Sequence, residues 1–356
     1  VVSTGISADL DFGDYLDYLV SDPKTQSILL YIEGISDSRR FMSSLRAAAR
    51  VKPVIALKVG RHQSGAAASM SHTGAMVGSD ETFSAALSRS GVLRVESVSQ
   101  LFAAAKALSS SHYRRPSERL VIITNGGGPG VLAADRATDQ GIELSELSEE
   151  TIAALNKVLP DVWSHGNPVD IIGDAPPERY RHAVDICLED PGVDGAIVVL
   201  TPQAMTEPTL VAEELVAAVA DKTKPVLTCW MGGTQVAEGR RVLKSARIPD
   251  FPMVESAVDA FAFMGTYNRN QRLLLQTPAK QSSDHEAPDT EGARLIIEGV
   301  LPERRKGLTE PESMAVLKAF KIPASQNAVA QSANEALIIA ESIGFPVAMK
   351  VLSNDI

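Results

Sequence analysis

The chain has 356 residues, which at about 150 residues per domain suggests two or three domains. Apolar residues make up 44% and charged residues 22%, as in folded globular proteins. The net charge of −10 argues against a basic nucleic-acid-binding surface. Two cysteines exclude a disulfide-rich scaffold or a cysteine-rich zinc site. No apolar run is long enough to span a membrane and no signal peptide opens the chain, so we predict a cytoplasmic protein without a nucleic-acid or membrane partner.

Short apolar runs alternate with longer amphipathic runs along most of the chain. Strands are expected at residues 27–32, 53–59, 120–124, 195–200 and 225–230. Residues 38–51 have helical spacing, with Phe41 and Leu45 on one face. Continuous apolar strands separated by helices are typical of a parallel sheet covered on both faces, so the predicted fold class is α/β.

A Val-Glu-Ser segment occurs twice and indicates an internal repeat. It opens a helix at residues 95–97 and again at 254–256, and each time two apolar strands precede it. We therefore predict two tandem flavodoxin-like domains with parallel sheets, at residues 1–112 and 113–272.

A polar stretch follows the second repeat. Residues 276–290 are rich in Pro, Ser, Gln, Asp and Lys, and we predict a linker over 273–305. Residues 306–356 are expected to form two helices and then a strand at 345–352, which is too short for a complete domain. Because the chain begins without methionine and ends directly after this strand, we expect it to be a segment of a longer polypeptide.

The first segment suited to phosphoryl chemistry is the Gly-, Ala- and Ser-rich stretch 60–78. It follows a strand and contains Ser71-His72-Thr73-Gly74-Ala75. A histidine in such a loop can attack phosphorus if another group holds its ring. The alternative is a loop histidine that only hydrogen-bonds to backbone groups.

The second segment is the glycine-rich Asn125-Gly126-Gly127-Gly128-Pro129-Gly130, between a strand and a helix. Backbone N–H groups and the dipole at a helix start attract phosphate. The alternative is a tight turn that needs glycines for its backbone alone. Four glycines in five positions exceed what a turn requires, which favours phosphate contact.

Two further segments lie at the expected carboxyl ends of strands, where ligands bind in parallel sheets. Glu33 could accept a hydrogen bond from an imidazole and orient it, or it could be an ordinary loop charge. Asn167-Pro168-Val169-Asp170 is interpreted as a turn, with a second rim loop as the alternative.

Taken together, these segments resemble the nucleoside-diphosphate-forming acyl-CoA synthetases. That family includes the ADP-forming acetate–CoA ligases and relatives of succinyl-CoA synthetase. The resemblance runs essentially from end to end and rests on residues 31–34, 71–75, 125–130 and 167–170. Residues 308–310, 343–347 and 349–350 resemble the opening of the family's ATP-grasp domain.

The resemblance implies a reversible conversion of acyl-CoA, ADP and phosphate to a carboxylic acid, ATP and CoA, through an acyl phosphate and a phosphohistidine. His72 would be phosphorylated and Glu33 would orient it. Contacts to phosphate are implied for Ser71, Thr73, Gly74, Gly126, Gly127, Gly128 and Gly130. Lys350 would approach nucleotide phosphates. ATP or ADP, CoA, phosphate and Mg²⁺ are the implied ligands, and the chain would form a homo-oligomer or pair with its own remaining domains.

The chain also departs from the family pattern. The CoA-binding domain and most of the ATP-grasp domain do not appear, so we expect the chain alone to be inactive in overall turnover. One alternative is a ligand-sensing, synthetase-like region of a protein lysine acetyltransferase fusion; His72 and Glu33 favour catalysis instead. A periplasmic type of two-lobed binding protein is disfavoured by the histidine loop. The family takes acetate, branched or aryl acids, and the motifs do not distinguish among them.

Overall fold

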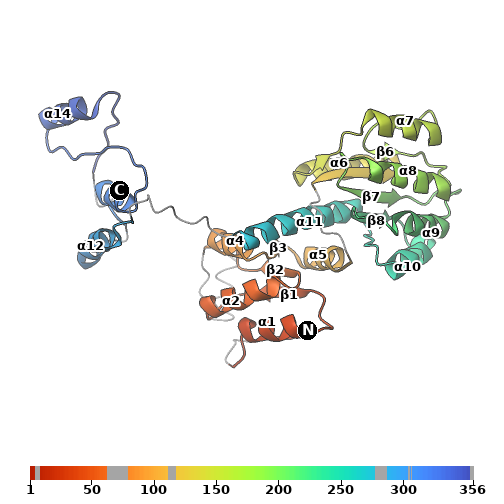
Figure 1. Cartoon of the computed structure of the whole chain (residues 1–356), viewed down its shortest axis with the longest axis horizontal. Coiled ribbons are helices and arrows are strands. Elements are labelled where there is room, and N and C mark those ends of the chain that lie inside the picture. The colour runs from red at the N-terminus through yellow and green to blue at the C-terminus, as the bar shows by residue number, and fades with distance from the viewer. Residues whose placement is uncertain are drawn as a thin grey trace. The chain divides into compact units, whose positions relative to one another are not determined.

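The computed structural model describes residues 1–4, 9–61, 79–110, 118–276, 287–303, 305 and 307–352. The chain divides into two compact units, Val1–Gln276 and Thr277–Ile356. The first unit contains two parallel sheets with helices packed on them, which confirms the predicted α/β class (Figure 1). The predicted boundaries of the individual domains remain predictions.

The first sheet has the strand order β1-β2-β3 among the described residues. All its pairs are parallel, and Ile32 at the end of β1 lies beside Lys58 at the end of β2. Its strands are β1 (Ile28–Ile32), β2 (Val54–Lys58) and β3 (Leu93–Val95), and the helices that the structure describes in this region are α1 (Phe12–Ser21), α2 (Ser38–Ala49), α4 (Asp80–Arg89) and α5 (Val98–Ser110).

The second sheet has the order β5-β4-β7-β8, with β6 paired to β4 beside this path. Counted along the chain without β6, this is the 2-1-3-4 order of flavodoxin-like folds. Its strands are β4 (Arg119–Thr124), β5 (Glu143–Leu144), β6 (Val169–Asp170), β7 (Gly195–Leu200) and β8 (Val226–Trp230). The helices around it are α6 (Gly127–Asp139), α7 (Glu149–Val158), α8 (Pro177–Glu189), α9 (Pro208–Val219), the 3₁₀ turn η1 (Thr234–Val236), α10 (Ala237–Ser245) and α11 (Val254–Leu275).

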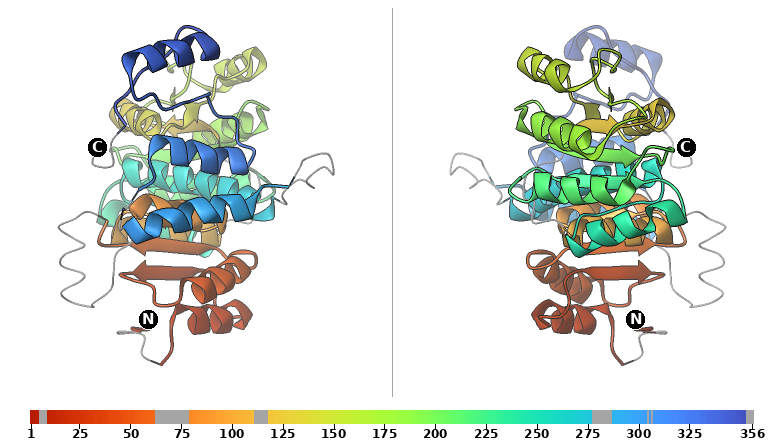
Figure 2. Two further views of the ribbon diagram at one scale, coloured as in Figure 1. Left: turned by 90° about the vertical axis from the view of Figure 1, so that its left-hand side faces the viewer. Right: turned by 90° about the vertical axis from the view of Figure 1, so that its right-hand side faces the viewer.

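Alternate side chains of the central strands enter two different cores. In β4, Val121 and Ile123 pack in the core under α7 to α10, whereas Leu120 and Ile122 face α6 and α11. Helices α8, α9 and α10 lie side by side over the first of these faces (Figure 2). Because both faces of these strands are buried, the strands appear in the sequence as continuous apolar runs.

Helix α11 joins the two sheets. It packs against both α5 and α6, so the two helices that begin at or directly after the repeated Val-Glu-Ser segments, α11 and α5, lie against each other. Phe261 of α11 lies in one core with Ile55 of the first sheet and Ile197 of the second. Further along the helix, Asn270 Nδ2 donates to the Val92 carbonyl at 2.7 Å. The two sheets therefore share one hydrophobic core.

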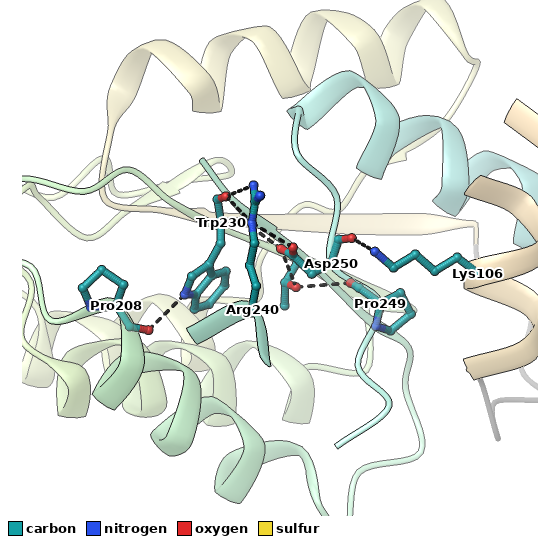
Figure 3. Close-up of polar contacts among 7 residues, drawn as sticks. Lys106, Pro208, Trp230, Arg240, Pro249 and Asp250 are labelled. Atoms are coloured by element: carbon teal, nitrogen blue, oxygen red, sulfur yellow. Dashed lines mark hydrogen bonds and ion pairs between the residues drawn. The ribbon is translucent and has the colours of Figure 1, made fainter. Parts of the chain in front are cut away.

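A buried ionic group lies at the end of β8 (Figure 3). The Asp250 carboxylate accepts from the Trp230 N–H at 2.9 Å and pairs with Arg240 Nε at 3.2 Å. Lys106 of α5 donates to the Asp250 carbonyl, which adds a polar contact between α5 and the second sheet. Burial raises the pKa of Asp250, and the Trp230 N–H, Arg240 and Lys106 oppose that rise.

The second unit is helical in its described part. It contains α12 (Thr290–Val300), the 3₁₀ turn η2 (Leu301–Glu303), α13 (Glu310–Ala319) and α14 (Ala333–Ile343). A capping box of Thr309 and Glu312 begins α13, and Arg305 binds both Glu312 oxygens at 2.9 and 2.7 Å. These hydrogen bonds lower the pKa of Glu312 to about 2.

The strand that we predict from the sequence at residues 345–352 is not present, so this prediction is wrong. The described residues there form no strand, and Phe345, Met349 and Val351 are exposed. A strand needs a neighbour to pair its backbone groups. The described part of the second unit contains no strand that could supply one.

The shared core predicts a large effect of truncating Phe261. Because this side chain is fully buried, Phe261→Ala should lower the free energy of unfolding by about 3–5 kcal/mol. Both sheets should lose stability together in urea denaturation followed by circular dichroism. Phe102→Ala on α5 is the matched control: its ring is 63% exposed, and a change within about 0.5 kcal/mol is expected. Separate transitions for the two sheets would contradict the shared core.

The Asp250 group predicts a pH-dependent effect of Arg240→Leu. Removing the partner leaves a buried carboxylate unpaired, and the loss of stability should be about 3–5 kcal/mol near pH 7. A carboxyl whose folded pKa is raised keeps its proton when the unfolded chain releases it, so stability falls as pH rises. The loss should therefore shrink towards pH 4 in urea titrations. Arg241→Leu, whose side chain is 72% exposed, is the control and should change little at either pH.

Candidate functional site

The carboxyl ends of β4 and β7 are held together by Asn125. Its Oδ1 accepts from the Thr201 N–H at 2.8 Å, and its Nδ2 donates to the Thr201 carbonyl at 2.9 Å. The Thr124 hydroxyl accepts from the Gly126 N–H at 3.0 Å. These contacts fix the turn that leads from β4 into α6, as the strand–glycine–helix pattern predicts.

The start of α6 is built of glycine and is open. Gly126 is the N-cap, and no side chain of the described residues caps the helix there. Gly127 and Gly128 are exposed, and a Cβ added to Gly128 would meet no atom within 4 Å. The N–H groups of Gly127 and Gly128, with the positive end of the helix dipole, therefore face solvent at the sheet edge, whereas the N–H groups of Gly126 and Gly130 donate to the Thr124 hydroxyl and the Gly126 carbonyl.

Asn167 pairs with the backbone of β4 between the part of that strand that pairs with β5 and the part that pairs with β6. Strand β5 pairs with the first half of β4 and β6 with the second half. Between them, Asn167 Oδ1 accepts from the Ile122 N–H at 3.0 Å and Nδ2 donates to the Leu120 carbonyl at 2.8 Å. The Asn-Pro-Val-Asp segment thus extends the sheet, and it places Asp170 Oδ2 3.3 Å from a Cβ built on Gly127.

Glu33 follows β1 at the carboxyl edge of the first sheet and is half-buried. Its carbonyl accepts from Lys58 Nζ at 3.0 Å, and burial lowers the pKa of that lysine. Asp80, at the start of α4, pairs with Arg94 Nη2 at 2.6 Å. Glu33, Asp80 and Arg94 therefore lie near enough to Lys58 to act on its charge at the end of β2.

The predicted site residues fall in three places. Gly126, Gly127, Gly128 and Gly130 are together at the edge of the second sheet, and Glu33 is at the edge of the first. Lys350 belongs to the second unit, where it is exposed and its Nζ lies 3.6 Å from Glu310 Oε2. Ser71, His72, Thr73 and Gly74 lie outside the described residues.

Sequence reasoning missed Lys58 and the role of Asn167. The signal for Lys58 is a lysine near the end of the otherwise apolar run at residues 53–59. The structural role of Asn167 has no comparable signal, because it depends on where β5 ends and β6 begins. In the described ranges no cluster of three or more His, Cys, Asp or Glu side chains is arranged to hold a metal ion. None of the helices there is long and apolar enough to cross a bilayer.

Three family models match consecutive parts of the chain. The succinyl-CoA ligase-like flavodoxin domain matches residues 1–108, the ligase-CoA domain residues 120–274, and an ATP-grasp domain residues 299–356. The order is the one that the sequence motifs indicate.

Related proteins agree with these models. The chain is 40% identical over 356 residues to an ADP-forming acetate–CoA ligase I of Archaeoglobus fulgidus, covering 100% of this chain and 50% of the relative. It is 38% identical over 263 residues to the alpha subunit of an ADP-forming acetate–CoA ligase II of Pyrococcus furiosus, covering 73% of this chain and 57% of that subunit. The chain thus spans about half the length of the curated relatives it matches.

A solved structure shows the same fold. It is the dinucleotide-forming acetyl-coenzyme A synthetase 1 of Ca. Korarchaeum cryptofilum, in complex with phosphate and ADP. It superposes with a TM-score of 0.72 at 37% identity, covering 79% of this chain and 61% of that chain. With the strand order, the glycine-rich helix start and the three matching models, this result leads to one conclusion: the chain belongs to the nucleoside-diphosphate-forming acyl-CoA synthetase family.

Proposed function

We propose that this chain carries the phosphoryl-transfer part of an ADP-forming acid–CoA ligase of the acetate–CoA ligase type. The observation that supports it most is the open glycine start of α6, uncapped by any side chain of the described residues at the carboxyl edge of a parallel sheet. Such a helix start favours a phosphate group through its N–H donors and dipole. The solved relative's complex with phosphate and ADP fits this chemistry.

The proposed reaction has three reversible steps. Phosphate attacks the thioester carbonyl of an acyl-CoA, and the C–S bond breaks to give acyl phosphate and CoA. An imidazole nitrogen of His72 then attacks the phosphorus, and the carboxylate leaves with the bridging oxygen. Finally a terminal oxygen of ADP attacks the phosphorus of phosphohistidine, the P–N bond breaks, and ATP and the free His72 imidazole are released. Each transfer depends mainly on positioning and on neutralising phosphate charge.

The residues of this chain would hold and orient the reacting groups. Gly126, Gly127, Gly128 and Gly130 begin the helix that would face phosphate, together with Ser71, Thr73 and Gly74 beside His72. The Glu33 carboxylate would accept a hydrogen bond from the second ring nitrogen of His72 and stabilise the imidazolium form. The exposed ammonium of Lys350 suits contact with nucleotide phosphates. Mg²⁺ is expected by resemblance, but the described residues offer no cluster for it, and we assign it no step.

The remaining parts of the reaction would come from other domains or subunits. The P. furiosus relative is named an alpha subunit, so in that enzyme a region similar to much of this chain lies within a separate subunit. We infer that this chain likewise acts together with a CoA-binding domain and the rest of an ATP-grasp domain.

His72→Ala should abolish phosphoenzyme formation without affecting the fold. The chain is incubated with ³²P-labelled acetyl phosphate, and protein-bound label that is acid-labile and base-stable is counted. Label is expected in the parent chain and none in His72→Ala, because no other group would be phosphorylated. Glu33→Gln should retain the label but acquire it more slowly, since a neutral amide stabilises imidazolium less.

Equal labelling of His72→Ala would overturn the assignment of His72, and an unchanged rate in Glu33→Gln would overturn that of Glu33. A parent chain that takes no label, even with its CoA-binding and nucleotide-binding parts present, would contradict the ligase function. That result would favour the ligand-sensing alternative.

Gly128→Ala should slow labelling by about tenfold while leaving stability unchanged or slightly higher. The added methyl group meets no protein atom, but it projects towards the helix start where phosphate would approach. Gly299→Ala in α12, also in open space, is the matched control and should not alter the labelling rate. Equal rates in the two variants would contradict phosphate contact at α6.

A further inference from the structure

Lys58 is a buried lysine at the carboxyl end of a central strand. Its residue is only 6% exposed, although it is the last residue of β2 and borders the strand-end region. Its Nζ donates to the Glu33 carbonyl at 3.0 Å and to the Val59 carbonyl, and lies 5.8 Å from the centre of the Phe83 ring. The ammonium therefore joins the main chain after β1 to the main chain after β2.

These contacts begin where the ladder between the strands ends. The last backbone bond of the pair runs from the Val59 N–H to the Ile32 carbonyl at 3.1 Å. Lys58 continues the connection one residue further, at the carbonyl of Glu33 itself. Without it, Glu33 would extend beyond the ladder on an edge strand.

Burying an ammonium has an energetic cost that a purely structural contact need not incur. Lysine is rarely buried unless its charge is paired, and burial lowers the pKa of Lys58. Asp80 of α4 and Glu33 counteract that effect, while Arg94 of β3 adds to it. An apolar residue would fill this space at a lower free-energy cost. The presence of a lysine is therefore explained by its hydrogen bonds to the two carbonyls.

We propose that Lys58 is a positioning residue for Glu33. By holding the Glu33 carbonyl and the Val59 carbonyl together, it fixes the main chain from which the Glu33 carboxylate projects. The inference rests on the proposed function in one respect, that Glu33 orients the phosphorylated histidine.

The chain contains a matched control on the same strand connection. Lys52 precedes β2, at the opposite end of the strand, and its Nζ likewise donates to two backbone carbonyls, those of Leu19 (2.6 Å) and Asp22 (2.5 Å). A general structural role for such lysines predicts similar behaviour of the two residues. A positioning role predicts that only Lys58 affects phosphoryl transfer.

The first measurement is amide hydrogen exchange, which does not depend on activity. Lys58→Met should raise exchange about tenfold in peptides covering residues 29–34 and 55–60, because the strand ends lose their connection. Lys52→Met should leave these peptides unchanged. If Lys58→Met does not fold, Lys58→Gln, which keeps a donor without the charge, replaces it. Unchanged exchange at Glu33 in a folded variant would overturn the proposal.

The second measurement is a double-mutant cycle on the rate of labelling by ³²P-acetyl phosphate. Lys58→Met should slow labelling by about 10- to 100-fold, as expected for a misplaced orienting group, and Lys52→Met by less than about twofold. In the Glu33→Gln background, Lys58→Met should slow labelling by less than about twofold further, because its effect passes through Glu33.

Additive effects in the cycle would overturn the positioning role, since a residue that only stabilises the fold would act independently of Glu33. A parent chain that takes no label, even with its CoA-binding and nucleotide-binding parts present, would contradict the proposed function instead. In that case the exchange measurement still decides whether Lys58 holds the Glu33 main chain.

Discussion

The hydrophobic core around α11 is the interaction on which the first unit depends. Phe261 lies in contact with a core that contains residues of both sheets, and Leu274 of the same helix enters the core between β1, α1 and α2. Gly91, with a φ of +76°, allows this approach, because a Cβ there would lie 2.7 Å from Leu274 Cδ2. One helix thus fixes the two sheets relative to each other, and with them the strand ends that hold the predicted site.

In both sheets, polar side chains take over where backbone ladders end. Asn125 connects β4 to β7, Asn167 bridges the gap between β5 and β6, and Lys58 connects the ends of β1 and β2. Each forms hydrogen bonds to backbone groups that lie beyond or between the ladder bonds. The result is a set of strand ends with defined main-chain positions in each sheet, which suits phosphoryl transfer because that chemistry relies on fixed positions.

Much of the fold was predictable from local patterns. The apolar runs at 195–200 and 120–124 became β7 and β4 because a strand buried on both faces must be apolar throughout. The strand predicted at 345–352 failed because strand formation depends on a partner as well as on composition. For the candidate site, the glycine turn at 126–130 was recognisable because the glycines themselves indicate the backbone conformation and the close approach that the turn allows. Lys58 stands out as a lysine in the apolar run 53–59, but its role was not recognised, because that role depends on the register between β1 and β2.

The sequence by itself determined the fold class, the repeat, the glycine-rich helix start and the resemblance that led to the family, because these depend on residue type and on spacing along the chain. Only the tertiary structure decided that α11 and α5, which begin at or directly after the two repeated segments, pack together and unite the sheets. It also decided that Asn167 completes a sheet edge and that a buried lysine holds Glu33. Those contacts join residues far apart in the chain, and their formation depends on the packing of the whole unit rather than on any local pattern.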